Sequence, residues 1–391
     1  MVKLYDREMS RVEVAAHAGA LSQFAGVRLM TLGDGVERGV RMLEFRTGSG
    51  LRFTVLVDRA MDIAEVEHRG RAIGWHSPTG FRHPGLHDPE GEDGFAWARS
   101  FSGFLSTCGL DHILSPQEVS TESYNYPGRK TARQPLHGRV GAIPAQLSGY
   151  GEVWHGDCCT LWAEGIIRQA TVFGENLALY RRIEADVGGD EIRLSDRVVN
   201  EGFLQTPHMM FYHINIGHPV LEEGARYLAP VRDVIWAAHE ARYQAQGVGY
   251  QNVPAPSNGF AEQVWQHEMA ANAAGEVPVA LVNDRIGLGI EITTRKDQMP
   301  CAFQWQYYQS GAYVMGIEPS THHVLGNQAA RDRGEMIWLG PQELRQYHSK
   351  FKVLDGSAEI AASEAAIRAI AAQPSDDFPT PSGQFPPLGG R

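Results

Sequence analysis

Apolar and polar residues alternate along much of this chain with the two-residue period of β-strands. Two segments show the alternation on both sides of a turn, 42–59 around Thr-Gly-Ser-Gly and 180–202 around Gly-Gly-Asp. In the second segment, one strand face carries the apolar residues Ile183, Ala185, Val187, Ile192 and Leu194. Both segments are therefore predicted to form antiparallel hairpins.

Further β-rich runs are spread over the rest of the chain, at 159–174, 277–294, 301–319 and 347–356. Glycine, with 43 residues, separates these runs, as expected where short strands meet tight turns. Helical patterns are few. An alanine-rich helix with Ile360, Ile367 and Ala371 on one side is predicted over 358–372, and a short helix over 10–24. Because strands follow strands without regular βαβ alternation, the pattern favours an all-β sandwich over a parallel α/β fold.

The domain organisation is predicted to be one large β domain, 25–356, between two terminal parts. Residues 1–24 form an N-terminal extension, and 357–391 hold the C-terminal helix and a tail rich in Pro and Gly, which is expected to be extended or disordered. Two segments, 76–97 and 115–135, are predicted to be long loops, and long loops in compact domains are often functional.

Composition and charge exclude several classes of protein. With 43% hydrophobic residues there is material for a sizeable core, and the net charge of −11 disfavours a nucleic-acid partner held through its phosphates. No run of 18 apolar residues and no signal-peptide pattern is present, so a membrane span is not expected. The four cysteines lack zinc-ligand spacing and an evident disulfide pairing, which favours the reducing cytoplasm. The pattern does not indicate an oligomeric state.

Candidate chemistry first appears in the segment 135–145, where His137 and Arg139 flank Gly138. In an extended chain their side chains point the same way, so both are expected to reach one ligand.

Two later segments add histidine and carboxylate. Strand alternation puts His213 and Asn215 on one face together with Phe211, and His208 on the opposite face. Glu318 ends an apolar strand before a proline, where a carboxylate projects into any cleft above the sheet.

Each of these signals also has an ordinary structural explanation. A histidine on a strand is usually a hydrogen-bonding residue of the core, and Glu-Pro at a strand end is often a solvated turn. Alternating aromatic residues often only pack. The order of the segments along the chain is more informative than any one of them.

Taken in order, the segments resemble the aldose 1-epimerase (galactose mutarotase) superfamily, and within it a branch of uncharacterised bacterial mutarotase-related proteins. The resemblance covers roughly residues 25–355. Its most specific stretch is IRLSDRVVNEGFLQTPHMMFYHINIGHPVL, while MGIEPST is similar to the segment that holds the catalytic glutamate and LGPQELRQYHSKFKV to the closing strands. LVDRAMDIAEVEHRGRAIGW, STCGLDH and LHGRVGAIPA resemble segments of the uncharacterised branch.

The chain departs from the superfamily pattern in two places. The usual closing Pro-Gly-Glu is Pro341-Gln342-Glu343, and the Asn-Gly-Arg loop near the N-terminus has no clear counterpart, with Asp58-Arg59 in a similar position. These departures leave the identity of the sugar open.

The resemblance implies a β-supersandwich of large antiparallel sheets with a sugar site in a concave groove. It further implies an isomerase that interconverts sugar anomers without a cofactor, with Glu318 as general base and His213 as general acid. The two groups are expected a sugar ring apart, with Arg139 or Arg59 keeping Glu318 ionised. The residues expected to contact the sugar are His137, Arg139, Asp58, Arg59, Asp62, Asn215, Trp305 and Tyr307, with Phe303 and Tyr308 as further aromatic candidates.

Two alternatives stay open at this level. The same groove could serve an isomerase, epimerase or lyase of a keto-sugar or sugar acid, with a divalent metal held by His137, His213 and Glu318. A non-catalytic sugar-binding protein is the other alternative, because a fold does not fix a function.

Overall fold

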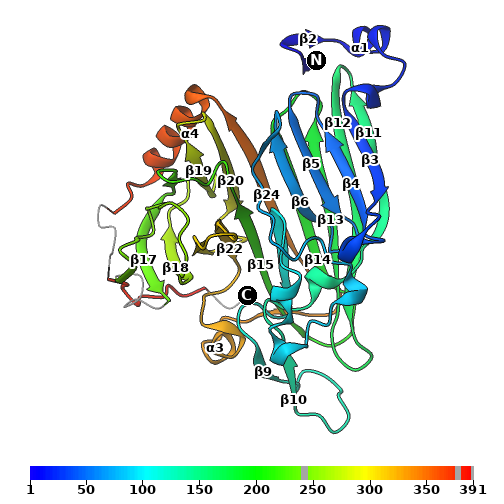
Figure 1. The fold of residues 1–391 in the computed structure, drawn as a ribbon. Helices are drawn as coiled ribbons and strands as arrows, with labels where there is room; N and C mark the ends of the chain where they lie inside the picture. Colours follow the sequence, from blue (N-terminus) through cyan, green and yellow to red (C-terminus); the bar gives the residue numbers. More distant parts are fainter. Residues whose placement is uncertain (239–244, 375–379, 389–391) are drawn as a thin grey trace.

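Three antiparallel β-sheets and two small hairpins make up most of the structure, a computed structural model that describes residues 1–238, 245–374 and 380–388 (Figure 1). The eight-stranded sheet has the order β11 (Gln146–His155), β12 (Cys158–Ala170), β13 (Asn176–Asp186), β14 (Glu191–Asn200), β24 (Leu344–Asp355), β20 (Leu288–Arg295), β19 (Glu276–Asn283) and β16 (Arg226–Leu228). The seven-stranded sheet has the order β17 (Val231–Ala237), β18 (Gln263–Met269), β21 (Cys301–Tyr307), β22 (Val314–Ser320), β15 (Thr206–Ile216) and β23 (Ile337–Leu339), with β8 (Leu105–Leu110) also paired to β15. The five-stranded sheet consists of β3 (Gly26–Thr31), β4 (Arg41–Arg46), β5 (Leu51–Leu56), β6 (Asp62–His68) and β7 (Arg71–Ala72).

The eight-stranded sheet lies behind the other two sheets, and the main core fills the space between them (Figure 1). Phe45 and Phe53 of the five-stranded sheet stack at 4.5 Å over one half of this core. Ile317 of the seven-stranded sheet packs toward Ile292 of the eight-stranded sheet over the other half. The all-β fold with large antiparallel sheets is therefore confirmed.

Every residue of strand β15 is buried, as is every residue of its neighbours β8 and β22. Its even-numbered residues Tyr212 and Ile214 belong to the main core, while Met209 and Phe211 pack in a separate cluster on the other face. A strand buried on both faces has no solvated side, so a polar side chain on it must be satisfied by protein or by a ligand.

The two hairpins predicted most clearly from the sequence are confirmed as β4–β5 and β13–β14. The segment 115–135, predicted as a long loop, instead contains the short hairpin β9 (Gln117–Ser120) and β10 (Thr131–Gln134). Residues 76–97 form an irregular segment with 3-10 turns at Pro84–Leu86 and Glu92–Gly94, as predicted.

The helices are short and lie at the periphery of the sheets: α1 (Arg11–His17), α3 (Gly326–Asp332) and α4 (Ser357–Ile370). Helix α4 buries Ile360 and Ile367 against the eight-stranded sheet, as predicted, whereas Ala371 is the extended residue that ends the helix. No helix in the described part of the chain is long and apolar enough to cross a membrane.

Both ends of the chain pack against the sheets. The hairpin β1 (Val2–Leu4) and β2 (Arg7–Met9) contributes Val2 and Leu4 to the main core, and the division of the chain at residue 25 stays a prediction. In the C-terminal tail, residues 380–388 have no regular secondary structure, and the amides of Ser382 and Gly383 donate hydrogen bonds to β17. The tail residues 375–379 and 389–391 lie outside the described residues.

A buried ion network joins the three sheets below the core. Arg181 on β13 donates to both carboxylate oxygens of Asp196 at 2.9 and 2.6 Å and to Asp62 at 3.1 Å. Tyr212 donates to Asp196 at 2.6 Å, and the amide and hydroxyl of Thr107 donate to Asp62. Because each charge is paired and hydrogen-bonded, burial of the network is tolerated.

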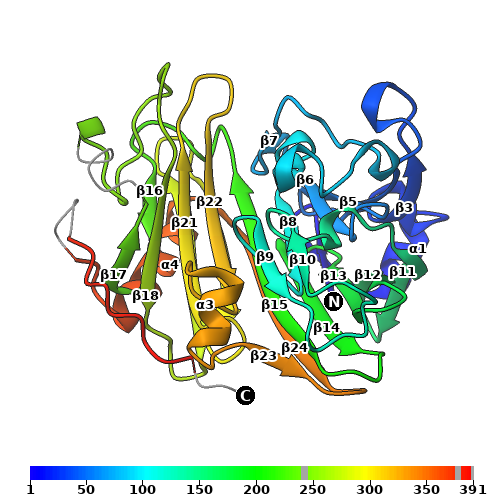
Figure 2. The same ribbon diagram turned by 90° about the horizontal axis from the view of Figure 1, so that it is seen from below.

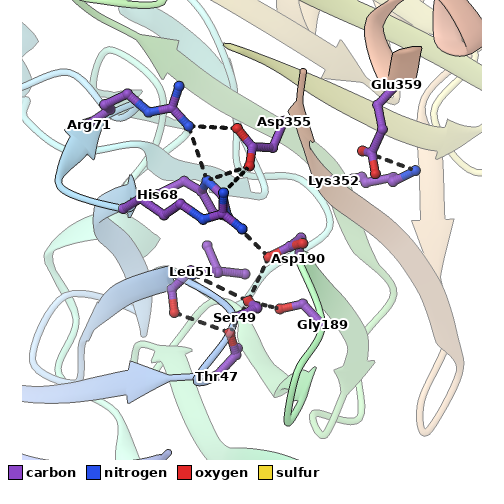
Figure 3. A network of polar contacts seen from close by, with 11 residues as sticks. Thr47, Ser49, Leu51, His68, Arg71, Gly189, Asp190, Lys352, Asp355 and Glu359 are labelled. Atoms are coloured by element: carbon purple, nitrogen blue, oxygen red, sulfur yellow. Dashed lines mark hydrogen bonds and ion pairs between the residues drawn. The ribbon is translucent and has the colours of Figure 1, made fainter. Parts of the chain in front are cut away.

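A second polar network holds the end of the five-stranded sheet to the eight-stranded sheet (Figure 3). Arg71 bonds Asp355 at the end of β24 at 2.7 Å, and the buried His68 lies between Asp355 and Asp190. Ser49 also bonds Asp190, at 2.6 Å. These contacts connect the sheets at the end of the molecule opposite to the β9–β10 hairpin (Figure 1).

Candidate functional site

His213 and Glu318 lie next to each other on the neighbouring strands β15 and β22. The pairing of Phe211 with Ser320 and of Asn215 with Gly316 places them side by side, and His213 Nε2 is 3.0 Å from Glu318 Oε1. Each residue is only 4% exposed. The sequence predicted that these two groups converge, and the structure brings them together. It does so at contact distance and not a sugar ring apart, so that part of the prediction is wrong.

Asn215 fixes the orientation of the His213 ring. Its amide nitrogen donates to the carbonyl oxygens of Gly103 and His213, so its side-chain oxygen faces His213 Nδ1 at 2.6 Å. This oxygen can only accept, so the proton of a neutral imidazole is held on Nδ1. The Nε2 lone pair of His213 is then free on the side of Glu318. The predicted sharing of one strand face by His213, Asn215 and Phe211 is confirmed.

Burial favours the uncharged form of both groups. It raises the pKa of Glu318 well above the usual 4.5, and the charge of Glu262 acts in the same direction. It lowers the pKa of His213 to about 3, against the hydrogen bond with Asn215. At neutral pH the pair therefore favours one proton, held on the carboxyl group.

Neither Arg139 nor Arg59 pairs with the Glu318 carboxyl group. Arg139 forms an ion pair with Glu90 at 2.8 Å. Burial lowers the pKa of Arg59, and the nearby charge of Asp62 acts in the opposite direction. The prediction that one of these arginines keeps Glu318 ionised is therefore wrong.

Aromatic rings surround His213 on its open side. The ring centroids of Phe101, Trp305, Trp97 and His137 lie 4.6, 5.2, 5.6 and 5.7 Å from that of His213. Trp75 packs against Phe101 and Trp305, and Trp305 stacks on Tyr307 at 5.8 Å. We call Trp75, Trp97, Phe101, Trp305 and Tyr307 the aromatic cluster.

Sequence reasoning found only part of the aromatic cluster. Trp305 and Tyr307 were predicted, whereas Trp75, Trp97 and Phe101 were missed although they lie in or beside the long loop singled out as functional. The density of aromatic residues in that loop was the available signal. Of the other aromatic candidates, Phe303 packs against Phe211 and Tyr308 belongs to the main core.

His137 completes the site from another segment. It has a left-handed backbone (φ 59°), stacks on Phe211 at 5.2 Å, and its Nδ1 is buried without a hydrogen-bond partner among the described residues. Glu318 Oε1 is also buried without a hydrogen bond in that part of the chain, because its contact with His213 lacks hydrogen-bond geometry. These two buried polar atoms are groups to which a ligand's hydroxyl groups could hydrogen-bond.

The remaining predicted binding residues point elsewhere. The turn at His137 is not extended, so Arg139 diverges from it toward Glu90, and the prediction that both reach one ligand is wrong. Asp58 binds Arg41 at 2.6 Å, and Asp62 belongs to the network of Arg181. Arg59 is buried with Nη1 unpartnered among the described residues, and no contact joins it to Glu318.

Within residues 1–238, 245–374 and 380–388, no group of three or more His, Cys, Asp or Glu side chains is placed to hold a metal ion. A cavity of about 490 Å³ beside the β9–β10 hairpin is lined by neither His213 nor Glu318. His213 and Glu318 are each 4% exposed, and the rings of Trp97 and Phe101 lie against His213.

Comparison with known proteins places the chain in a family. The model of a domain of unknown function, DUF4432, matches residues 37–353, which is most of the chain. The chain belongs to the DUF4432 family. No curated protein matches the sequence of this DUF4432 member.

Solved structures with the same fold are known for sequences of low identity. A Klebsiella pneumoniae protein whose name provisionally assigns it as an aldose 1-epimerase aligns with a TM-score of 0.81 at 24% identity, covering 92% of this chain and 91% of its own. A galactose mutarotase-like protein from Clostridium acetobutylicum aligns with a TM-score of 0.56 at 11% identity, covering 85% and 99% of the two chains. A galactose 1-epimerase from Lactobacillus acidophilus aligns with a TM-score of 0.51 at 11% identity, covering 84% and 99%. The DUF4432 chain thus has the galactose mutarotase-like fold.

Proposed function

We propose that this DUF4432 protein is an isomerase of the aldose 1-epimerase type that interconverts the anomers of a small sugar. The observation that carries the proposal is the contact of 3.0 Å between His213 Nε2 and Glu318 Oε1 beneath the aromatic cluster. The resemblance in sequence and the names of proteins with this fold support it.

The chemistry of mutarotation suits two groups at contact distance. The anomeric hydroxyl and the ring oxygen are bonded to the same carbon, so the groups that serve them must also lie side by side. The base takes the proton of the anomeric hydroxyl while the acid protonates the ring oxygen, and the bond between the anomeric carbon and the ring oxygen breaks. After rotation of the open aldehyde, the reverse transfers close the ring on the other face.

The protonation of the pair supports this cycle. In the productive complex Glu318 is the base and His213 the acid, and the roles exchange on closure. Since burial favours a single proton for the pair, that proton need only move between Glu318 and His213 when a ligand enters. The sugar's hydroxyl groups would supply the hydrogen bonds that Glu318 Oε1 and His137 Nδ1 lack. A positioned acid or base typically contributes about 10²–10⁴-fold each.

The aromatic cluster accounts for binding. Half-exposed Trp97 is stacked on Phe101 at 4.0 Å, and together they cover His213. A sugar that reaches Glu318 must displace part of this cover and stack its apolar face on the rings.

The test is anomer exchange followed by NMR over free aldoses, aldose phosphates and uronates, with and without a divalent metal. We expect at least one aldose to exchange faster with the wild-type protein, and Glu318→Gln and His213→Ala to lose this acceleration. Glu335→Gln, a change at a similarly buried carboxylate paired with Arg333, serves as the matched control and should remain active.

Running the assay in D₂O separates the proposal from its alternatives. Mutarotation exchanges only oxygen-bound protons, whereas isomerisation or epimerisation beside a carbonyl places deuterium on carbon. Deuterium on carbon, or acceleration that depends on added metal, would favour keto-sugar chemistry. Binding without any acceleration would favour a sugar-binding protein.

A further inference from the structure

A cavity is lined by residues of the β9–β10 hairpin, the end of β12 and helix α3. These elements lie at the end of the molecule that faces the viewer in Figure 2. The volume of the cavity is about 490 Å³, within the range of small-ligand sites. Its wall includes Asp111, Glu175, Tyr124, Tyr126 and Arg331. None of these residues belongs to the site of His213 and Glu318.

Asp111 is held in a fixed orientation at the back of this cavity. Its two carboxylate oxygens accept hydrogen bonds from the amides of Gln134 at 2.8 Å and Gln169 at 2.7 Å. The oxygen of Gln169 in turn accepts from the backbone amide of Leu110 at 3.0 Å. A carboxylate held by side chains that are themselves oriented is a preorganised acceptor.

Two further polar groups face the same space. Glu175 is 6% exposed, and burial together with the charge of Asp111 raises its pKa to about 7. The hydroxyl of Tyr124 is buried and makes no hydrogen bond of ordinary geometry within the described residues, although Thr206 is near enough to influence its pKa. A buried hydroxyl without a partner is costly unless something occupies the cavity.

The charges of the wall decide what the cavity can hold. Four guanidinium groups, of Arg129, Arg139, Arg168 and Arg331, share the wall with the carboxyl groups of Glu90, Asp111 and Glu175. Arg139 binds Glu90 and Arg168 binds Glu201, while Arg331 bonds Asn327 at 2.8 Å. An anion would meet the carboxyl groups, and a cation would meet the arginines, so either would be desolvated beside a like charge. A neutral polyol can donate to Asp111, accept from arginine and lay an apolar face on a tyrosine ring.

We infer that this cavity is a second ligand site, which binds a neutral sugar or other polyol of about one hexose in size. This inference does not rest on the proposed function. Pro207, in the cavity wall, and His213 lie six residues apart on β15, which corresponds to about 20 Å of extended strand. None of the residues that line the cavity belongs to the site of His213, Glu318, His137 and the aromatic cluster.

The inference is tested by calorimetric titration of the full-length protein with neutral and charged sugars. The probes are D-glucose, D-galactose and D-mannose, compared with D-glucuronate and D-glucosamine. At least one neutral hexose should bind, with the charged sugars weaker by about tenfold or more, because each brings a charge beside a like charge.

Tyr124→Phe and Glu175→Gln assign the binding to this cavity. Each should weaken binding of the neutral sugar by about fivefold to twentyfold, since Tyr124→Phe removes a hydroxyl and Glu175→Gln replaces a carboxyl oxygen with an amide nitrogen that can only donate. Tyr124→Phe should leave the thermal midpoint unchanged or raised, because the hydroxyl makes no hydrogen bond of ordinary geometry among the described residues. If Tyr124 were only structural, the Tyr124→Phe protein would have a lower thermal midpoint and an unchanged affinity for the neutral sugar. Tyr150→Phe and Glu122→Gln are the exposed controls and should bind like wild type.

Three results would overturn the inference: no binding of any neutral hexose, equal binding of the charged sugars, or unchanged affinity in both cavity variants. Glu318→Gln separates this inference from the proposed function. If it abolishes anomer exchange but leaves the Tyr124-dependent binding intact, both stand. If Glu318→Gln abolishes both anomer exchange and the Tyr124-dependent binding, only the inference of a second site is wrong.

Discussion

Two buried clusters of ionisable residues lie on opposite faces of β15, and they differ in how completely their polar atoms are paired. Around Arg181, each side-chain nitrogen and carboxylate oxygen of Arg181, Asp196 and Asp62 has a protein partner. Around His213 and Glu318, Glu318 Oε1 and His137 Nδ1 have no hydrogen-bond partner among the described residues. The first cluster is complete without a ligand, and the second is not.

The difference teaches which buried charges are structural. A fully paired network contributes to the stability of one conformation, and removing one member leaves the others uncompensated. A site with open hydrogen-bonding positions costs stability in the free protein and is worth keeping only if a ligand completes it. Burial alone does not distinguish the two, since Arg181 and His213 are both nearly inaccessible.

The largest expected effect is a loss of stability when the fully paired network of Arg181, Asp196 and Asp62 is broken. Asp196→Asn removes the main partner of Arg181 and leaves a buried guanidinium charge with only Asp62. The free energy of unfolding should fall by about 3–5 kcal/mol, measured by urea denaturation. The exposed pair of Arg226 and Asp284 is the control, where Asp284→Asn should cost about 0–1 kcal/mol. A similar, small loss in both variants would contradict the structural role of the network.

The next effect concerns the geometry of the open pair. Gly316 lies against both groups: an added methyl would overlap the Glu318 carboxyl oxygen and come within 3.2 Å of His213 Cε1. Gly316→Ala should therefore lower the rate of anomer exchange by about 10²-fold, the typical cost of misplacing a reacting group. Gly33→Ala, at a position with open space, is the matched control. Normal activity in Gly316→Ala would mean that the placement of Glu318 is not critical.

A third, smaller effect is the pH dependence of stability. The pKa of Glu318 is raised on folding, so the folded state keeps its proton while the unfolded state loses it above about 4.5, and stability is lost as pH rises. Glu318→Gln should therefore gain stability relative to wild type, and the gain should grow with pH above 4.5. The pKa of His213 is lowered to about 3, so its neutral burial costs stability as pH falls below 6.5, and His213→Gln should gain there. Denaturation midpoints at several pH values check both signs, and gains with the opposite pH dependence would refute the protonation scheme.

The smallest effect is expected from the aromatic cluster. Trp305→Leu removes one of the rings beside His213 and the bond from its indole nitrogen to Glu262. We expect KM to rise about tenfold with a smaller change in kcat, because stacking binds the substrate and the transition state alike. A fall in kcat at constant KM would instead assign Trp305 to positioning His213.

The sequence predicted the strands well because their alternation is a local property. The hairpins β4–β5 and β13–β14 and the burial of Ile360 and Ile367 on α4 follow directly from it. The short β9–β10 hairpin was missed, since its strands lack a long alternating run.

The positions of the site residues could be predicted from the sequence only where strand alternation and register determine where a side chain lies. His213, Asn215 and Glu318 converge because alternation and register place them there. Arg139 was misplaced because the positive φ of His137 breaks the extended chain, a feature that no periodicity reveals. The protonation of Glu318 and the position of Trp97 over His213 depend on how segments distant in the sequence pack together. The local alternation of residues does not reveal that packing.

The most direct measurement is made on Glu318→Gln alone, in which anomer exchange and the urea midpoint are determined at pH 8 on the same preparation. If Glu318 and His213 form a catalytic pair, Glu318→Gln should lower the rate of anomer exchange by about 10²-fold or more and leave the urea midpoint unchanged or raised. Retained exchange, or a loss of stability comparable to that of Asp196→Asn, would show that Glu318 is a structural residue.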